Sequence, residues 1–412
     1  MRPLAVTVLA SISVAAPSHA AEPFDAAAAA DEYIALLRDA YAYLERDDFD
    51  VDAQLAHTHA RAAATTTVEA FRHELHRGSL AFTDPHLLVG PLVATDPNVV
   101  PTSADLVVAR RDGAAVVVDV RADSPADAAG VRPGWQLLEV GGVAVDEAVE
   151  QLWDGAVVAT TPAQWDYALT LVANGRRGGE RTLRFRTPKG KRKRVLANPR
   201  DFATQVRERP PVEVERRGTV AILRLNNQLG DRATIPRLDE AVAEVLDADA
   251  VVIDLRNTPS GGNTDVARAL LGHFVDVPQP YQMHTIPGVE RATTVPRRFV
   301  EYVEPRAPRY EGRVAVVGGA WTGSMGEGCV IGLHANGARA FASDMGDLLG
   351  GLDNARLEHA EVWVELGTEA LFHVDGTPRE DFVGDVALPS ADRDADGADP
   401  AWEALEAWLA GR

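Results

Sequence analysis

The residues best suited to chemistry lie in a glycine-rich turn between an apolar run and a second, helix-like run. The chain reads RVAVVGG, then AWTGSMGEG, then CVIGLHANG. Ser324 would therefore lie at the N-terminus of a helix, where free backbone N–H groups and the helix dipole favour a serine alkoxide or an oxyanion. Gly323 and Gly326 permit a sharp turn and close approach by a substrate. A serine at a helix start is also a common N-cap, so this segment alone leaves both interpretations open.

A second glycine-rich turn follows the apolar run AVVIDL and reads RNTPSGGNTD. The backbone N–H of Gly261 or Gly262 could bind a substrate carbonyl oxygen, and the N–H of Met325 would supply a second donor. Two such donors would form an oxyanion hole for acyl transfer. The alternative is a glycine-rich loop without a catalytic role.

The elements that must carry these turns alternate between strand and helix from Gly218 onward. AVVIDLR and RVAVVGG are continuous apolar runs, which is typical of buried parallel strands. ATIPRLDEAVAEVLDA and DVARALLGHF have the spacing of helices, and DPAWEALEAWLAGR predicts a terminal amphipathic helix. We therefore expect a layered α/β core over residues 218–412.

Three regions precede this core. Residues 21–94 are rich in Ala, and their apolar residues follow the period of one helix face, which predicts a helical region. These residues are Tyr33, Leu36, Leu37 and Tyr41. In residues 95–198, LVVARRDGAAVVVDV predicts two strands and a tight turn, SPADAAG a short helix, and WQLLEV another strand. Residues 199–217 are rich in Pro and charge and lack apolar periodicity, which predicts a linker.

Composition limits the classes of function. The 412 residues suggest two or three domains, and a hydrophobic fraction of 46% is that of a globular protein. Because 61 acidic residues oppose 41 basic ones, for a net charge of −20, nucleic-acid binding is disfavoured. The single cysteine, Cys329, excludes an intrachain disulfide framework.

The first twenty residues have the layout of a secretory signal peptide. Arg2 precedes an apolar run from Leu4 to Ala16, and small residues precede a cleavage point after Ala20. The run is too short to span a bilayer comfortably, and no later run reaches spanning length. We therefore expect an exported protein, periplasmic or extracellular, without a stable membrane span. The alternative is an uncleaved membrane tether.

Together these segments resemble the C-terminal processing and tricorn-type serine peptidases, a tail-specific protease family with an inserted PDZ domain. Thr322–Glu327 resembles the nucleophile segment of that family. Asp254–Arg256, followed by Gly261 and Gly262, resembles its strand-plus-glycine segment. The resemblance implies that Ser324 is the nucleophile and that polypeptides are the substrates.

The same resemblance implies an α/β fold. It predicts a βα core of the crotonase and Clp-protease type (218–412), an inserted PDZ-like β domain (95–198) and an N-terminal helical region (21–94). A bacterial PDZ domain binds an extended peptide by strand addition, often at its C-terminal carboxylate.

The general base distinguishes two branches of this family. One branch uses a Ser-Lys dyad, but here the only lysines are Lys189, Lys191 and Lys193, all within the PDZ-like region. The other branch uses a histidine in a segment that resembles Asp-Gly-His-Thr, just before the PDZ insertion. Here that place reads FTDPHLL, so the resemblance implies that His86 is the general base.

Other histidines are alternatives for the general base, and a carboxylate is expected as the third catalytic group. His334 lies ten residues beyond Ser324, about 15 Å along one helix, which is too far for proton transfer. His359 and His373 remain alternatives. The family has an orienting carboxylate near its C-terminal end, and the resemblance implies Glu380 for that role. Asp381 is the alternate for that carboxylate.

An acidic turn near the C-terminus has the spacing of a calcium-binding loop. Asp392, Asp394, Asp396 and Glu403 fit that spacing. No helix is predicted before the turn and Pro400 interrupts it, which favours an acidic surface turn.

The sequence therefore predicts an exported serine peptidase that hydrolyses peptide bonds in protein tails or unfolded polypeptides. Ser324, His86 and Glu380 would form its Ser-His-carboxylate site, with Gly261, Gly262 and Met325 at the oxyanion hole. No cofactor or metal is implied, because the protein can supply every group. The alternative is a catalytically inactive PDZ-containing binding protein on the same scaffold.

Overall fold

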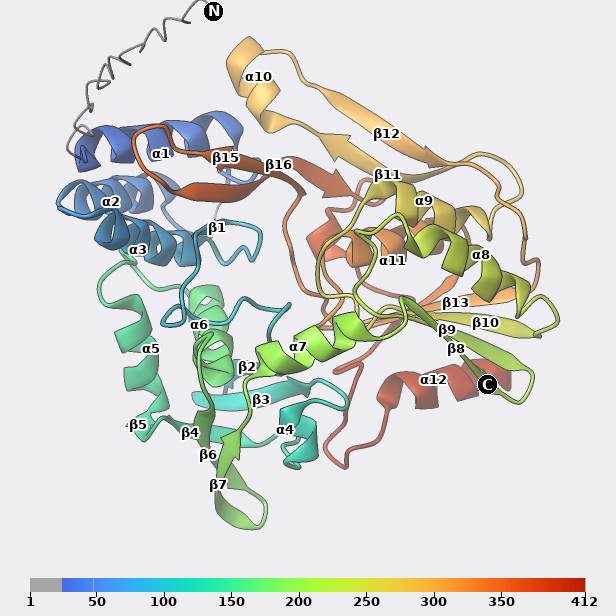
Figure 1. Ribbon diagram of the computed structural model, residues 1–412. Coiled ribbons are helices and arrows are strands. Elements are labelled where there is room, and N and C mark those ends of the chain that lie inside the picture. The colour runs from blue at the N-terminus through green and yellow to red at the C-terminus, as the bar shows by residue number, and fades with distance from the viewer. Residues whose placement is uncertain (1–23, 47, 412) are drawn as a thin grey trace, which may run out of the picture.

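A computed structural model describes residues 24–46 and 48–411. The predicted signal peptide, residues 1–20, lies outside these ranges. The described chain forms three sheets with helices around them (Figure 1). Within these ranges no helix has the length and apolar character needed to cross a bilayer.

A six-stranded sheet forms the centre of the predicted core. Its order is β17-β14-β13-β10-β9-β8, with β8 antiparallel at one edge and the other strands parallel. The strands are β8 (Val212–Arg217), β9 (Val220–Leu225), β10 (Ala250–Asp254), β13 (Arg313–Gly318), β14 (Arg339–Ala342) and β17 (Val386–Ala387). The runs AVVID and RVAVVG are central strands, as their continuous apolar character predicts.

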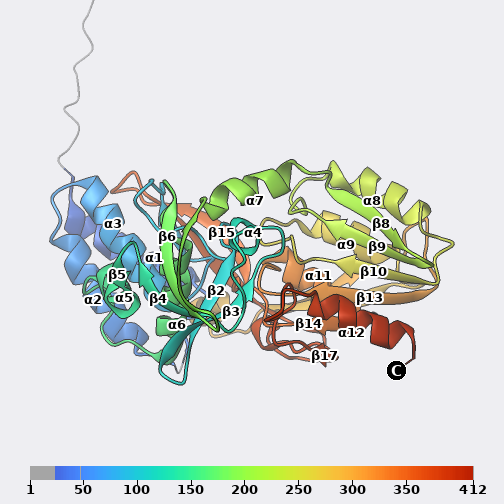
Figure 2. The same ribbon diagram turned by 90° about the horizontal axis from the view of Figure 1, so that it is seen from below.

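Helices cover both faces of this sheet (Figure 2). One face carries α8 (Thr234–Ala243), α9 (Thr264–Gly272) and α11 (Met325–Ala335), and the other carries α12 (Pro400–Leu409). Alternate residues of β10 point to opposite faces, so Val251 and Ile253 pack with the first set and Val252 packs with α12. The layered α/β core is confirmed.

The N-terminal region is helical, as predicted. It contains α1 (Ala26–Ala40), α2 (Val51–Ala63), α3 (Val68–Ser79) and the 3-10 turn η1 (Leu80–Phe82). Tyr33, Leu37 and Tyr41 are buried, which confirms the predicted helix face. These helices pack on Val362, Val364 and neighbouring residues of a second sheet.

This second sheet joins the two ends of the chain. Its order is β1-β16-β11-β12, and β15 also pairs with β16. The strands are β1 (Leu88–Gly90), β11 (Gln279–Thr285), β12 (Arg298–Val303), β15 (Gly351–Arg356) and β16 (Trp363–Phe372), with α10 (Pro287–Thr293) between β11 and β12. Because β1 pairs antiparallel with β16, Gly90 lies opposite Trp363. The segment just before β1, which holds His86, is thereby fixed beside the core.

The third sheet is formed by residues between β1 and the core. Its order is β2-β3-β4-β6-β7, and β5 pairs with β4. The strands are β2 (Leu106–Arg111), β3 (Ala114–Val120), β4 (Gln136–Val140), β5 (Val143–Ala144), β6 (Arg181–Thr187) and β7 (Gly190–Leu196). The helices are α4 (Pro125–Ala128), α5 (Val145–Trp153) and α6 (Pro162–Asn174). The predicted hairpin, short helix and following strand all form here, and Ser124 caps α4 through the Asp127 N–H.

Residues 199–217 differ from the predicted linker. They form α7 (Pro199–Glu208) and β8, the edge strand of the core sheet. Only Pro199, Phe202 and Val206 of α7 are buried, and only Val212 of β8 is fully buried. Such half-exposed elements carry too few apolar residues to produce a periodic signal, which is why the composition suggested a linker.

Candidate active site

Ser324 occupies the turn between β13 and α11. Its backbone has φ +55° and ψ −119°, a conformation that non-glycine residues rarely adopt. The residue is half-buried, and α11 begins at the next position. Backbone strain of this kind is found at sites where one side chain must be presented at a fixed angle. The structure therefore places Ser324 at a helix N-terminus, as predicted.

The two glycine-rich turns lie side by side because β10 and β13 are adjacent parallel strands. Thr258 and Thr322 form a β-bridge, and the Gly323 N–H donates to the Thr258 carbonyl (2.9 Å). A Cβ atom built on Gly262 would lie 1.8 Å from the Met325 Cβ. Only glycine fits this contact, which brings the Gly262 backbone against Met325.

The oxyanion donors proposed from the sequence are thus partly brought together. Gly262 contacts Met325, whereas a Cβ atom built on Gly261, which has φ +65°, would meet no atom within 4 Å. Among the described residues, the N–H groups of Gly262 and Met325 have no hydrogen-bond acceptor. Two free N–H groups beside a serine are the chemistry of an oxyanion hole.

Glu327 holds the next loop against Ser324. Its buried carboxylate accepts hydrogen bonds from the backbone N–H groups of Ser324 (2.5 Å), Asp347 (3.0 Å) and Leu348 (3.3 Å). Burial raises the pKa of Glu327 to about 7, opposed by the nearby Arg379 guanidinium and by these N–H donors. Arg379 also donates to the Leu348 carbonyl. Sequence reasoning included Glu327 in a motif but gave it no role, and it missed Arg379.

His86 contacts the far end of the same loop. Its Nδ1 lies 3.0 Å from the Leu349 carbonyl oxygen, which can only accept, so Nδ1 carries the proton and Nε2 keeps its lone pair. Burial, opposed by the Leu349 carbonyl and aided by the Arg379 guanidinium, lowers the pKa of His86 to about 4. The ring is therefore neutral at physiological pH, and this tautomer is the one a general base requires.

Asp84 fixes the backbone on which His86 stands. Its carboxylate accepts from the backbone N–H groups of His86 (2.8 Å) and Leu349 (3.2 Å) and from the Tyr41 hydroxyl (2.8 Å). Burial raises the pKa of Asp84 to about 6. Sequence reasoning did not give Asp84 this role, although the residue lies within the segment that identified His86.

The structure connects His86 and Ser324 through loop 346–350 rather than directly. In the described part of the chain, no hydrogen bond joins the two side chains. The loop binds Thr322 through the Gly346 N–H (2.8 Å), and its Leu348 and Leu349 bond to Glu327 and His86.

Glu380 does not contact His86 in this conformation. It lies in the 3-10 turn η2 (Arg379–Asp381), where it is half-buried, and burial raises its pKa. Its charge acts on Tyr43, whose pKa is raised first by burial and then by Glu380. The acceptor for His86 Nδ1 is instead the Leu349 carbonyl. Asp381, the alternate carboxylate, is exposed.

The alternative histidines His334, His373 and His359 contact other parts of the molecule. His334 and His373 pair with each other (Nδ1 to Nε2, 3.1 Å) near the C-terminal end of α11, about 15 Å along the helix axis from Ser324. The His359 backbone N–H bonds to Glu32 of α1 (3.1 Å). Of these four histidines, His86 is the one that contacts the loop bonded to Glu327 and Thr322.

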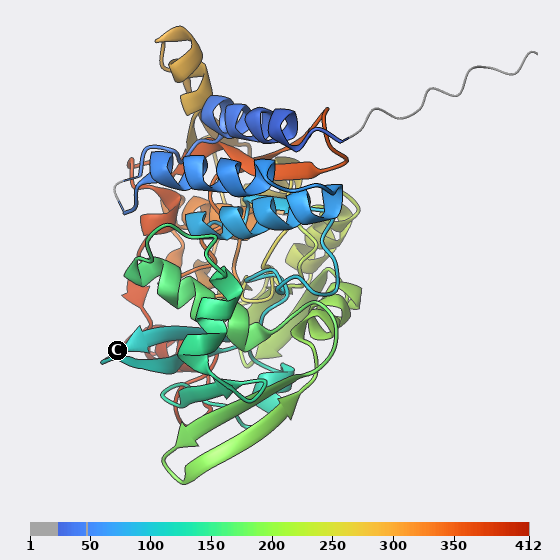
Figure 3. The ribbon, with the colours of Figure 1, turned by 90° about the vertical axis from the view of Figure 1, so that its left-hand side faces the viewer.

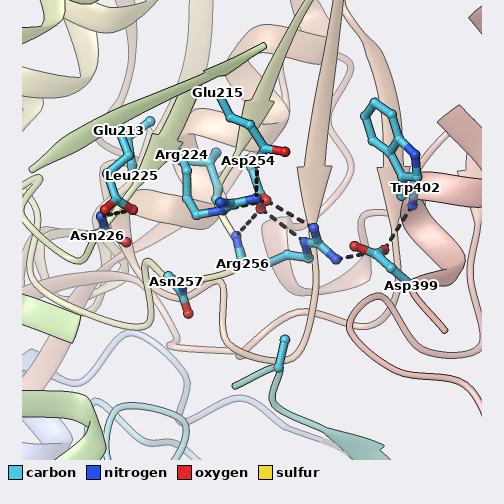
Figure 4. A network of polar contacts seen from close by, with 12 residues as sticks. Glu213, Glu215, Arg224, Leu225, Asn226, Asp254, Arg256, Asn257, Asp399 and Trp402 are labelled. Atoms are coloured by element: carbon cyan, nitrogen blue, oxygen red, sulfur yellow. Dashed lines mark hydrogen bonds and ion pairs between the residues drawn. The ribbon is translucent and has the colours of Figure 1, made fainter. Parts of the chain in front are cut away.

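A buried ion network anchors the Asp254–Arg256 motif (Figure 4). Arg256 donates to Asp254 (3.0 Å), to Asp399 at the start of α12 (3.0 Å) and to the Ala391 carbonyl (2.8 Å). Burial acts to raise the pKa of Asp254, but Arg256 and Arg224 outweigh it and hold the pKa below its usual range. The motif therefore ties the glycine-rich turn after β10 to the C-terminal segment.

A cavity of about 510 Å³ borders this arrangement. It lies between β2 and α6 on one side and residues 343–347 of the core on the other, and Thr83 and Pro85 also line it. Its wall therefore includes the segment before His86 and the loop that binds Glu327. This cavity is large enough for a few residues of an extended chain.

Among the residues that the structure describes, no cluster of three or more His, Cys, Asp or Glu side chains is placed to hold a metal ion. In the acidic C-terminal turn, Asp394 accepts from the backbone N–H groups of Asp396 (2.9 Å) and Ala398 (2.8 Å). Asp399 caps α12 through the Trp402 N–H (2.9 Å).

Comparisons with known proteins place the fold. No family model and no curated protein matches the chain by sequence. Mature CPAF, in a structure with lactacystin, superposes with a TM-score of 0.59 and 16% identity, covering 94% of this chain and 97% of that one. The photosystem II D1 C-terminal processing protease gives 0.54 and 14%, covering 90% and 96%. A putative peptidase from Parabacteroides merdae gives 0.53 and 11%, covering 93% and 96%.

One of these structural neighbours is named a C-terminal processing protease and another a putative peptidase. The predicted resemblance is therefore confirmed for the fold, and it spans nearly the whole described chain. Identities of 11–16% show the fold alone.

Proposed function

We propose that this chain is an exported serine peptidase that cleaves polypeptide tails or unfolded segments. One observation carries the proposal. A strained serine at the N-terminus of α11 lies beside two backbone N–H groups, those of Gly262 and Met325, for which no described residue provides an acceptor. A nucleophile next to paired free donors is the minimum arrangement for acyl transfer.

The proposed reaction uses residues already described. Ser324 Oγ attacks the peptide carbonyl as its proton passes to His86 Nε2, and the Gly262 and Met325 N–H groups bind the oxyanion. His86 then protonates the leaving amine, and water hydrolyses the acyl-enzyme by the reverse proton path. The neutral ring and its Nδ1–H tautomer support this role.

In this proposal His86 moves to Ser324 before proton transfer. Loop 346–350 contacts His86 through Leu349 and the serine turn through Glu327 and Thr322, so the movement would include this loop. We assign Glu380 as the carboxylate that stabilises the imidazolium once it forms. Catalytic hydrogen bonds are often completed only when substrate binds, so the present separation does not exclude the pair.

The residues 95–198 are proposed to act as a PDZ-like domain that holds the substrate chain near the 510 Å³ cavity. Export is proposed from the signal-like residues 1–20, and the mature chain would begin at Ala21. N-terminal sequencing of protein recovered from the cell envelope or medium tests this start.

A fluorophosphonate probe tests the proposed chemistry. The mature protein should form one covalent adduct at Ser324, located by peptide mass. Ser324→Ala should abolish labelling, whereas Ser260→Ala, the matched control beside Gly261, should leave it intact. Labelling should also fall by about 10²–10⁴-fold in His86→Ala, as expected for loss of a general base.

The inactive binding protein is the second candidate, favoured by the lack of contact between His86 and Ser324. It predicts no labelling of folded protein, with or without added unfolded polypeptide, together with retained polypeptide binding. The peptidase proposal is overturned if both results are obtained.

A further inference from the structure

The β2–β7 sheet has two edges, and one of them is already occupied. Alternate residues of β2 direct their backbone groups outward, where side chains of α6 bind them. The N–H groups of Leu106, Val108 and Arg110 donate to Asn174 (3.2 Å), Thr170 (3.0 Å) and Asp166 (2.7 Å). The Leu106 and Val108 carbonyls accept from Asn174 (2.8 Å) and Thr170 (3.0 Å).

The hydrogen bonds between α6 and β2 repeat because the spacing of residues along the helix matches the spacing along the strand. Residues 166, 170 and 174 are four apart, which is about 6 Å along a helix, and residues 106, 108 and 110 are two apart, which is about 6.8 Å along a strand. The α6 side chains therefore take the place that an added strand would fill. An extended peptide cannot pair with β2 unless α6 moves.

The opposite edge, β7, is open. The Thr182 carbonyl accepts from Gly141 on the β4 side, so Thr182 and the residues two apart from it bond to β4. In the β6–β7 register, their partners on β7 are Lys191, Lys193 and Val195. These three residues therefore direct their N–H and C=O groups away from the sheet. Among these outward groups, the Lys193 carbonyl is the only one that forms a hydrogen bond within the described ranges. It accepts from the Arg194 side chain (3.3 Å).

The same edge concentrates positive charge on an otherwise acidic molecule. The outer part of the β6–β7 hairpin, residues 184–194, carries seven cationic side chains, and every lysine of the chain lies in it. They are Arg184, Arg186, Lys189, Lys191, Arg192, Lys193 and Arg194. Of these, only Arg184 forms an ion pair with a described residue, Glu139 (3.0 Å). The hairpin projects from the body of the molecule (Figure 3).

We propose that the β7 edge, and not β2, binds an extended acidic segment of the polypeptide substrate by strand addition. The inference rests on the proposed peptidase function and names its substrate class. Backbone pairing would come from Lys191, Lys193 and Val195, and charge complementarity from the hairpin. Lysines on an edge strand also oppose pairing with a second copy of the same strand, because like charges repel, whereas an acidic segment complements their charge.

The observations favour a polypeptide over a lipid surface. A free strand edge offers N–H and C=O groups in alternation, which only another backbone can match along its length. An anionic lipid surface, by contrast, would bind the hairpin through its positive charge alone and would leave these backbone groups unused.

Peptide binding to the Ser324→Ala protein tests the inference without requiring catalysis. The probe is a fluorescent peptide of about ten alternating Glu and Thr residues, the upper range of natural strand lengths, at about 0.1 M salt. Lys191→Glu with Lys193→Glu should weaken binding by at least about fivefold. Asp166→Ala, the matched change at the β2 edge, should leave binding unchanged.

A backbone variant separates strand addition from charge. Lys193→Pro removes an outward N–H without breaking a β6–β7 bond, and should bind about two- to tenfold more weakly than Lys193→Ala. A peptide with Gln in place of Glu should also bind more weakly.

The inference is overturned if Lys193→Pro equals Lys193→Ala, if the Gln peptide binds equally well, or if only Asp166→Ala alters binding. Vesicle binding combined with absent peptide binding would also overturn it. Because the readout does not involve Ser324, a failure here leaves the phosphonate result unaffected.

Discussion

At the residue scale, the site depends on how burial sets protonation. His86 is neutral because burial lowers its pKa to about 4, and its Nδ1 proton is fixed by the Leu349 carbonyl. Glu327 is held by three backbone N–H groups while burial raises its pKa to about 7. Neither property follows from residue type, because both arise from neighbours that are distant in sequence.

The pH dependence of activity should reflect the lowered pKa of His86. A base must be unprotonated, so kcat/KM should rise with pH along a limb centred below the ordinary imidazole value of about 6.5. The same shift makes the folded state bind fewer protons than the unfolded state between pH 6.5 and about 4. Stability should therefore fall as pH decreases through this window. A limb at or above pH 6.5 would contradict the assignment.

Replacing Glu380 tests its proposed role as a positioning residue. Glu380→Gln should lower kcat by about 10–10²-fold with KM unchanged, and should move the acid limb to lower pH, since the carboxylate no longer stabilises the imidazolium. Asp381→Asn, the exposed neighbour, should behave as wild type. An unchanged pH profile in Glu380→Gln would leave the Leu349 carbonyl as the orienting group.

At the element scale, the site exists because two parallel strands end side by side. The turns after β10 and β13 contact each other through Thr258 and Thr322, and the Arg256 network fixes the first of them. The apolar runs and glycines predicted this juxtaposition correctly. Sequence could not place Glu380 or loop 346–350, because irregular segments take their shape from contacts rather than from a periodic pattern.

The contact between the two turns can be tested at adjacent glycines. Gly262→Ala should abolish phosphonate labelling, because its Cβ would lie 1.8 Å from the Met325 Cβ. Gly261→Ala meets no atom within 4 Å and should cost only about 1 kcal/mol through its positive φ. Equal labelling of the two variants would argue against a role for the Gly262 N–H.

Removing Arg256 should loosen the first turn and alter acid stability. In Arg256→Met the buried Asp254 carboxylate keeps only its longer ion pair, with Arg224. The substitution should therefore lower the free energy of unfolding by about 3–5 kcal/mol. The lowered pKa of Asp254 contributes stability above its unfolded value, which is lost as pH falls. The acid-unfolding midpoint of the variant should therefore move to higher pH. Arg224→Met, a change at a more exposed partner, should have a smaller effect in the same urea and acid titrations.

At the scale of the whole molecule, β1 holds the N-terminal region to the core. The helical region and the layered core were predictable from periodicity, but their joint sheet was not, since β1 has only three residues. The pairing of Gly90 with Trp363 fixes the segment that carries His86. The α7–β8 segment likewise connects residues 95–198 to the core through a helix and a paired strand, whereas composition alone predicted a linker there.

Enlarging Gly90 should disturb the site from a distance. A Cβ on Gly90 would lie 2.0 Å from the Trp363 ring, so Gly90→Val should displace β1 and slow phosphonate labelling of Ser324. Adding Trp363→Ala should restore part of the labelling rate by removing the ring. If Ser324 in the double variant is labelled no faster than in Gly90→Val, the clash between Gly90 and Trp363 does not cause the slower labelling.

The β1–β16 pairing also has a consequence for biosynthesis. The ribosome makes His86 early and Ser324 late, and β16, which must pair with β1, emerges later still. A nascent chain therefore lacks a complete site until translation is nearly finished. A fragment cut between β1 and the core would likewise hold only one of the two proposed catalytic residues, so removal of the N-terminal region should abolish the proposed activity.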